Sequence, residues 1–172
     1  DSTRGITKNL ASETTGAEST STTQYASWNT DGFTLIYGGQ QVPNYSGHTY
    51  VAWQWKANGG TTASNSDGNI TSTVQANQDA GFSIVTYTTA GSAATIGHGL
   101  GAKPDVILLK KRNGAISWYV RHVSLGTSYI NLNLTNAAAA NPSATWTTTE
   151  PTTSVYSIGT SSDFNVNGGE YV

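Results

Sequence analysis

The chain has 172 residues, a formal net charge of −2, and only 10% of its residues are Asp, Glu, Lys or Arg. The absence of cysteine excludes disulfides and thiolate metal sites, and no apolar run reaches the length of about 18 residues that a membrane-spanning helix needs. Polarity comes instead from Thr, Ser, Asn and 19 glycines, which suit pleated strands and tight turns, so the composition predicts an all-β protein.

The first strand signals lie in the N-terminal third of the chain. Phe33–Tyr37 is a short apolar run that follows a turn pair. In Tyr50–Lys56, Val51, Trp53 and Trp55 alternate with smaller or polar residues. We expect these three side chains to bury one face of a strand.

Five further strand candidates follow, at Phe82–Thr88, Asp105–Lys111, Ser117–Val123, Tyr129–Leu134 and Ser154–Ile158. The second of these is apolar on both faces, which predicts a central position in its sheet. A single helical turn is expected at Asn136–Ala140, because Pro142 ends it early. The pattern as a whole predicts an antiparallel β-sandwich or jelly-roll-like unit.

An imperfect internal repeat of about 120 residues runs through the chain. The matching residues keep their order: Gly5 and Gly126, Asn9-Leu10 and Asn131-Leu132, Trp28 and Trp146, Gly47 and Gly168, and Tyr50-Val51 and Tyr171-Val172. We therefore expect residues 1–57 to be the second half of one unit and residues 58–172 to be the following unit, truncated at its last strand. On this interpretation Tyr171 and Val172 begin the strand that corresponds to Tyr50–Lys56.

Several segments resemble a repeated β-rich domain of large bacteriophage virion structural proteins, which are tail-fibre or adhesin-like exterior components. The segments are DSTRGITKNL, SWNTDGFTL, SGHTYVAWQWK, AGFSIVTYT, IGHGLGAKPDVILLKKRN and SWYVRH. The resemblance implies a location on the virion exterior, contacts with other virion subunits, a homo-oligomer, and structural or host-attachment work. It carries over no catalytic or ligand residues.

The sequence carries no pattern that favours catalysis. The glycine-rich run Gly97–Gly101 leads through Pro104 into a strand, whereas a phosphate-binding loop opens a helix. The histidines are not at metal-ligand spacing, and the acidic residues form no glycosidase signature. We expect no enzyme activity, no cofactor and no metal, and a glycan-degrading enzyme is the third and weakest alternative.

Aromatic residues are the candidates for carbohydrate recognition, because flat rings stack on sugars. The candidates are Trp28, Trp118, Tyr119 and Trp146. Each could instead belong to the core, and Trp118 and Tyr119 must point to opposite faces of a strand. A carbohydrate-binding module for host surface glycan is therefore the second hypothesis for function.

Charge is unevenly distributed along the chain. Residues 97–123 carry five basic residues against one acidic residue, whereas residues 1–96 and 124–172 each have a net charge of −3. Lys110, Lys111, Arg112 and Arg121 are expected to form a local positive patch that meets an anionic glycan or an acidic neighbouring subunit. The alternative is a solvated strand end, and nucleic-acid binding is not expected because the remaining chain is acidic. The leading hypothesis is a structural virion component that acts through β-rich protein contacts.

Overall fold

The computed structural model describes residues 1–36, 43–57, 61–140, 146 and 149–172, and its strand ladders are antiparallel. The strands before residue 60 are β1 (Lys8–Asn9), β2 (Ser19–Thr20), β3 (Tyr25–Trp28) and β4 (Phe33–Leu35). Those after it are β5 (Ala63–Asn65), β6 (Ser72–Asn77), β7 (Phe82–Thr88), β8 (Ala94–Gly97), β9 (Val106–Leu109), β10 (Tyr119–His122), β11 (Ser128–Asn131), β12 (Ala139–Ala140), β13 (Val155–Ile158) and β14 (Glu170–Tyr171). In the described ranges, helical structure is limited to the 3₁₀ turn η2 (Val123–Leu125).

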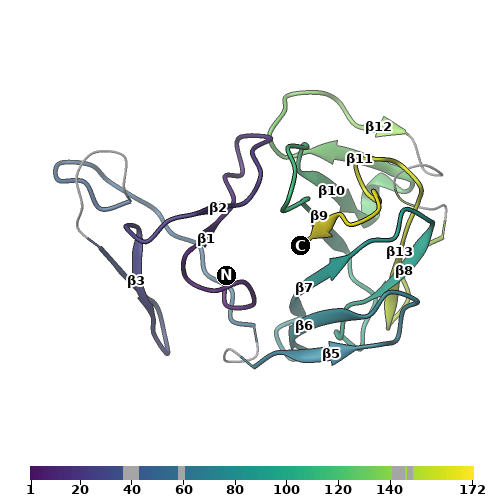
Figure 1. Ribbon diagram of the computed structural model, residues 1–172, viewed down its shortest axis with the longest axis horizontal. Helices are drawn as coiled ribbons and strands as arrows, with labels where there is room; N and C mark the ends of the chain where they lie inside the picture. The colour runs from purple at the N-terminus through teal and green to yellow at the C-terminus, as the bar shows by residue number, and fades with distance from the viewer. Residues whose placement is uncertain (37–42, 58–60, 141–145, 147–148) are drawn as a thin grey trace.

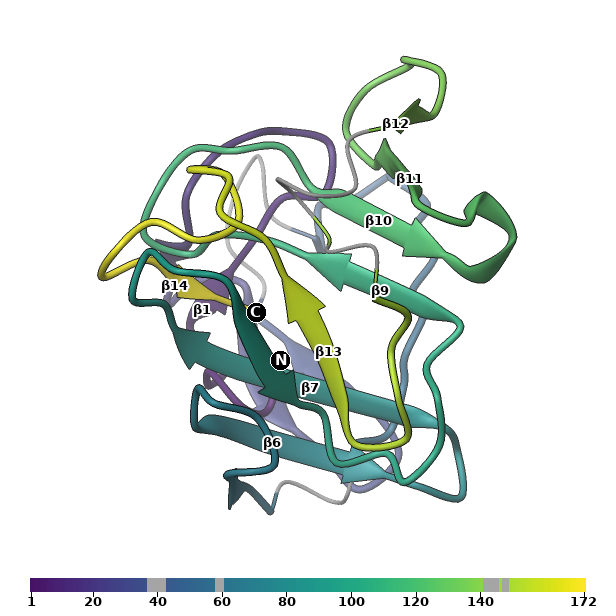
Figure 2. The same ribbon diagram turned by 90° about the vertical axis from the view of Figure 1, so that its right-hand side faces the viewer.

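Two four-stranded sheets make up most of the C-terminal part, with the strand orders β14-β7-β6-β5 and β12-β11-β10-β9. Strand β14 lies between them (Figures 1 and 2). Tyr171 pairs with Tyr87 of β7 on one side and with Lys111 on the other. The N–H of Val172 donates to the carbonyl of Lys110 over 3.0 Å, and the Lys110 N–H donates back over 2.9 Å. The backbone of β14 therefore joins the two sheets.

The core lies on the inner side of this joined sheet, where the two-stranded β8–β13 sheet packs against it. The cluster consists of Tyr87, Ala94, Ile96, Leu109, Tyr119, Trp146, Tyr156, Ile158, Phe164 and Tyr171. Tyr171 is fully buried, and its ring stacks on Tyr87 with the centroids 5.6 Å apart. Residues 1–56 supply none of this cluster; Figure 1 shows that β1 to β3 lie to one side of it.

The all-β, antiparallel fold predicted from the sequence is confirmed, and β7 has the predicted bounds. Two details of the prediction are wrong. Over Val106–Leu109, strand β9 pairs only with β10 among the described strands, and the second neighbour expected of a central strand, β14, lies only beside Lys110 and Lys111. Ala139–Ala140 forms strand β12 on the edge of β11 in place of a helical turn, because an alanine run this short cannot nucleate a helix and pairing satisfies its backbone.

The strand predicted at Tyr50–Lys56 is also wrong. The segment forms no strand, and Val51, Trp53 and Trp55 are 75%, 77% and 66% exposed. A strand needs a neighbouring backbone to pair with, and no described strand pairs with these residues. We name this stretch the tryptophan segment.

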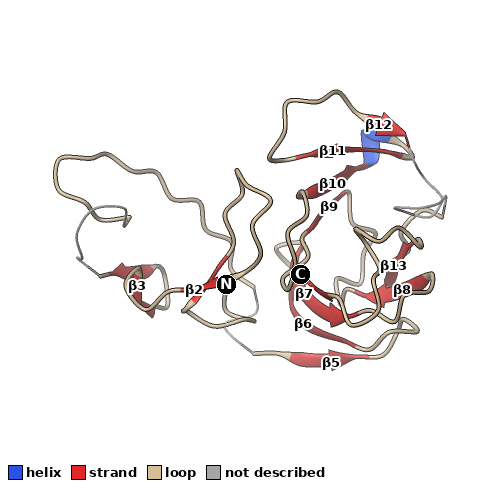
Figure 3. Cartoon of the chain, turned by 45° about the horizontal axis from the view of Figure 1, so that its top comes forward, coloured by secondary structure: helices blue, strands red, loops and turns tan. Residues whose placement is uncertain are grey.

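Two local structures nevertheless recur at the spacing of the predicted repeat. Strands β1 and β2 pair Lys8 with Thr20 and Asn9 with Ser19, and β11 and β12 pair the residues 120 positions further on in the same register. The spacing between the paired residues is therefore the same in both, ten positions from Asn9 to Ser19 and from Tyr129 to Ala139. Figure 3 shows the long loop that joins β11 to β12.

The second recurring structure is the turn at residues 45–48, which returns at residues 166–169. In each, the fourth residue donates its N–H to the carbonyl of the first, over 3.4 Å and 2.8 Å, and the third is a glycine with a φ of 82° or 72°. The hydroxyl of Tyr50 accepts the N–H of residue 45 over 3.1 Å, and that of Tyr171 accepts the N–H of residue 166 over 3.5 Å. The local conformation is the same, but Tyr171 is buried and Tyr50 is exposed. The division into units at residue 57 stays a prediction.

The two tyrosines provide a matched test of the joining strand. Replacing Tyr171 with Ala removes a fully buried ring between the sheets, and we expect a loss of about 3–5 kcal/mol in the free energy of unfolding. Tyr50→Ala removes a ring with the same turn contact but little burial, and should cost less than about 1 kcal/mol. Denaturant unfolding of both variants measures the difference, and equal costs would contradict the role assigned to β14.

Candidate interaction surfaces

Two of the aromatic residues predicted to bind sugar lie in the core. Tyr119 and Trp146 are 7% and 3% exposed, and both pack against Phe164, with ring centroids 4.3 Å and 5.1 Å away. The Tyr119 hydroxyl donates to a carboxylate oxygen of Asp163 over 2.5 Å. The prediction that Tyr119 and Trp146 are exposed sugar-binding residues is therefore wrong. Both side chains belong to the hydrophobic core, where large aromatic residues are commonly buried.

The other two aromatic candidates lie apart from each other. Trp28 is 42% exposed in the β3–β4 hairpin, where its ring contacts Tyr25 and Phe33. Trp118 is half-buried, and its indole N–H donates to the carbonyl of Ala11 over 2.8 Å. The structure therefore does not bring the four predicted rings together into one binding platform.

Lys110, the first of the predicted basic residues, is fully buried. Its ammonium group donates to three carbonyl oxygens, those of Thr15, Lys111 and Ile116, at 2.9–3.2 Å. Burial, followed by the charge of Lys111, lowers the pKa of Lys110. This side chain ties the N-terminal segment to the sheet and presents no charge to a partner.

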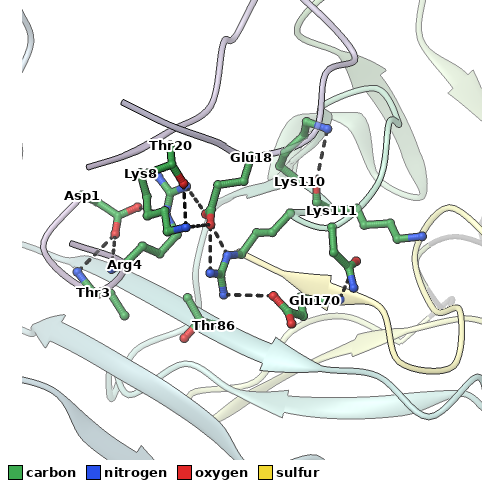
Figure 4. Close-up of polar contacts among 12 residues, drawn as sticks. Asp1, Thr3, Arg4, Lys8, Glu18, Thr20, Thr86, Lys110, Lys111 and Glu170 are labelled. Atoms are coloured by element: carbon green, nitrogen blue, oxygen red, sulfur yellow. Dashed lines mark hydrogen bonds and ion pairs between the residues drawn. The ribbon is translucent and has the colours of Figure 1, made fainter. Parts of the chain in front are cut away.

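Arg112 pairs with the carboxylate of Glu18. Figure 4 shows Glu18 within a group of polar contacts that includes Arg4. The Arg112 guanidinium donates to both oxygens of Glu18, over 2.9 Å and 3.1 Å, and Arg4 donates to the same carboxylate over 2.8 Å. Burial alone would raise the pKa of Glu18, but the hydrogen bonds from Arg112 and Arg4 outweigh it and lower the pKa from 4.5 to about 2. The Glu18 carboxylate is therefore negatively charged at neutral pH and accepts hydrogen bonds from both positively charged arginines.

Arg121 is 5% exposed and donates to Glu150 over 2.7 Å, and Lys103 reaches the same carboxylate over 2.8 Å. Hydrogen bonds from Lys103 and then Arg121 lower the pKa of Glu150. The prediction of a positive patch is wrong for Lys110, Arg112 and Arg121, because burial or ion pairs within the chain satisfy each charge. Lys111 keeps partial exposure.

The N-terminal residues 1–18 lie across part of the outer face of the joined sheet. The contacts run from Ser2 to Gln75, from Ala11 to Trp118, from Thr15 to Lys110 and from Glu18 to Arg112. They cover the middle of this face and the end of the β9–β11 sheet that carries Trp118. The described residues leave the rest of the β9–β11 surface uncovered.

The uncovered part is apolar. Val106 and Leu108 on β9 and Ile130 and Leu132 on and after β11 are between 37% and 51% exposed, and we name these four residues the apolar face. Leu108 and Ile130 flank Val120 of β10 in the strand register. On the opposite side of β9, Ile107 and Leu109 belong to the core. This explains the sequence of β9, which is apolar on both faces although only one face is covered.

Sequence reasoning missed this surface although its signal was present. A strand apolar on both faces is typical of a central strand, but such a strand can also have one face that its own chain leaves bare.

In the part of the chain that the structure describes, no group of three or more His, Asp or Glu could hold a metal ion, and none of the residues forms a helix of the length and hydrophobicity that a membrane crossing requires.

The ion pairs of Glu18 predict a specific pH dependence. Glu18→Gln should lower the free energy of unfolding at pH 7 by about 1–3 kcal/mol, because two arginines lose a charged acceptor. The folded-state pKa of Glu18 is depressed, so its contribution is present above pH 4.5 and is lost as pH falls towards 2. The stability gap between variant and wild type should therefore close over this range. The exposed Glu13→Gln serves as the control and should show no gap at any pH.

Comparison with known proteins identifies a family but no characterised relative. No curated protein and no solved structure matches the chain. One family model, described as a domain of unknown function (DUF7483), matches residues 1–172. The chain therefore belongs to the DUF7483 family.

Proposed function

We propose that the chain is a structural component of a bacteriophage virion exterior that works by packing its β surfaces against neighbouring subunits. The observation that carries the assembly part of this proposal is the apolar face. The virion location rests on the resemblance of the sequence segments described above.

A sheet face exposed to water ordinarily carries polar residues, whereas Val106, Leu108, Ile130 and Leu132 place branched apolar side chains there. Covering them would gain roughly 25 cal/mol for each Å² of apolar surface removed from water. The residues are contiguous in the strand register, so one flat partner surface can cover them together. The partner proposed is a second copy of this chain, through its own apolar face, since an isologous contact is the commonest form of homo-oligomer.

Carbohydrate binding is the second candidate, and Trp28 favours it. The ring is exposed and is held by Tyr25, 5.2 Å away, and Phe33, 6.3 Å away between centroids. A supported exposed ring is what stacking on a sugar requires. A glycan-degrading enzyme is the weakest candidate, because the paired charges described above are used within the fold.

The apolar face can be tested by a double variant. Ile130→Ser with Leu132→Ser should weaken self-association in sedimentation velocity by about tenfold or more, because buried apolar anchors carry most of the binding energy at such contacts. The matched control is Val123→Ser, an exposed apolar residue outside the face. The far-UV circular dichroism of all variants should remain that of the wild type.

Two results would contradict the proposal. A wild-type chain that stays monomeric at high concentration would remove the second copy as the partner. Release of sugar products from bacterial envelope polysaccharide, abolished by replacing a single Asp or Glu, would replace assembly with catalysis as the function.

The virion location has its own test. An antibody raised against the chain should label the surface of intact phage particles.

A further inference from the structure

Trp55, in the tryptophan segment, is an exposed ring that the fold holds in place. It is 66% exposed, yet its ring stacks on Phe82 at the start of β7, with the centroids 6.1 Å apart and the planes at 21°. Because Phe82 packs against one face of the indole, the opposite face is the one left to solvent. Trp53 is more exposed, at 77%, but among the described residues no ring packs against it. Trp55 is therefore a supported platform on which a ligand can stack.

The backbone beside Trp55 is held as well. The side-chain amide of Asn77 donates to the carbonyl of Lys56 over 3.1 Å, and Asn77 pairs with Phe82 in the β6–β7 ladder. The Asn77 side chain also accepts the N–H of Ala80 over 3.1 Å, within the turn that joins β6 to β7. The tryptophan segment is thus attached to the end of the β6–β7 hairpin. A ligand that stacks there meets a ring whose freedom is already restricted, which lowers the entropic cost of binding.

Polar side chains lie where the tryptophan segment meets the hairpin. Gln54 and Lys56 flank Trp55 in the sequence, and Asp79 lies in the β6–β7 turn. All three are exposed, and no hydrogen bond or ion pair joins their side chains to another residue that the structure describes. The turn also borders an open hollow of about 460 Å³, with Asn77 and Asp79 among its polar lining. Donors and acceptors for a ligand are therefore present, together with one positive and one negative charge.

These features match a ligand that has both an apolar face and hydroxyl groups. A protein partner that covered Trp55 with apolar side chains would also bury the polar side chains beside it without partners, which is costly. A pyranose ring presents C–H groups on its face, which stack on an aromatic ring, and hydroxyl groups around its edge, which bond to amides and carboxylates. The opposite charges of Lys56 and Asp79 favour an uncharged sugar over an anionic one.

We propose that Trp55 is the stacking platform of a binding site for uncharged pyranose sugars, with Asn77 and Asp79 bonding the sugar hydroxyls. The inference goes beyond the proposed assembly function and does not depend on it, because the apolar face belongs to the other four-stranded sheet. It also differs from the second candidate function, in which the sugar stacks on Trp28.

The test titrates the full-length chain with two soluble, uncharged oligosaccharides, cellohexaose and β-1,4-galactohexaose, and follows the backbone amide signals of residues 77–82 by NMR. Both sugars should shift these signals, because stacking needs only the C–H face that the two sugars share. Trp55→Ala should weaken binding about tenfold or more, and Trp55→Tyr should weaken it less, because tyrosine keeps a ring. Asp79→Ala should also weaken binding. Val51→Ser is the matched control, since it removes an exposed apolar side chain of the same segment and should leave binding unchanged.

The support from Phe82 has a separate readout. Phe82→Leu keeps an apolar side chain at this position but removes the ring that backs Trp55. We expect weaker sugar binding and a lower steady-state fluorescence anisotropy from Trp55, measured in a chain whose other four tryptophans are replaced by phenylalanine. The far-UV circular dichroism of every variant should match that of its parent chain, so a loss of binding would not reflect unfolding.

The outcomes separate this inference from the proposed function. No shift at residues 77–82 with either sugar at about 10 mM would overturn the platform. Loss of binding in Trp28→Ala but not in Trp55→Ala would overturn it in favour of the second candidate. If Trp55→Ala weakens self-association and the wild type binds no sugar, the ring is a contact between copies and the inference is wrong. Sugar binding at Trp55 in a chain that stays monomeric would support the inference while the assembly function fails.

Discussion

Strand β14 is the constraint on which the remaining architecture depends. It is only two residues long, yet Tyr171 pairs with β7 on one side and with Lys111 on the other, and its ring fills the core against Tyr87. Without it the β7 sheet and the β9 sheet would have no shared backbone ladder, and the inner β8–β13 sheet would have no single surface to pack against. A short strand thus determines how two larger sheets are placed.

The few charged residues of the chain mostly form ion pairs and hydrogen bonds within the fold, close to the joined sheet. The Glu18 carboxylate has two arginine partners, the Glu150 carboxylate has one arginine and one lysine, and the Lys110 ammonium has three carbonyl oxygens. These contacts attach the N-terminal residues and Glu150 to the rest of the fold. Apolar residues are left on the outer surface instead, at the apolar face and the tryptophan segment. Association by apolar contact is what such a distribution favours, with little dependence on salt.

The sequence was sufficient to predict the fold class and the strong strands, because β7 and β13 combine β-branched or aromatic residues with clear turns. The short polar strands β1, β2 and β5 carry no such pattern. Charge partners also could not be predicted, since Glu18 and Arg112 are 94 positions apart. The failures at β9 and at Tyr50–Lys56 have one cause: an apolar pattern indicates that a face is to be covered, but not whether the same molecule covers it. Such mismatches between local sequence and structure concentrate at functional surfaces.

The position of β14 between two strands that run parallel to each other has a mechanical consequence. A force applied along β14 would act on the hydrogen bonds on both of its sides in shear. The bonds on both sides would then have to break at the same time. Tension across it would open the same bonds one after another, starting at one end. The strength of the domain would therefore depend on the direction of the load, a property of the unfolding rate under force that an equilibrium free energy does not report.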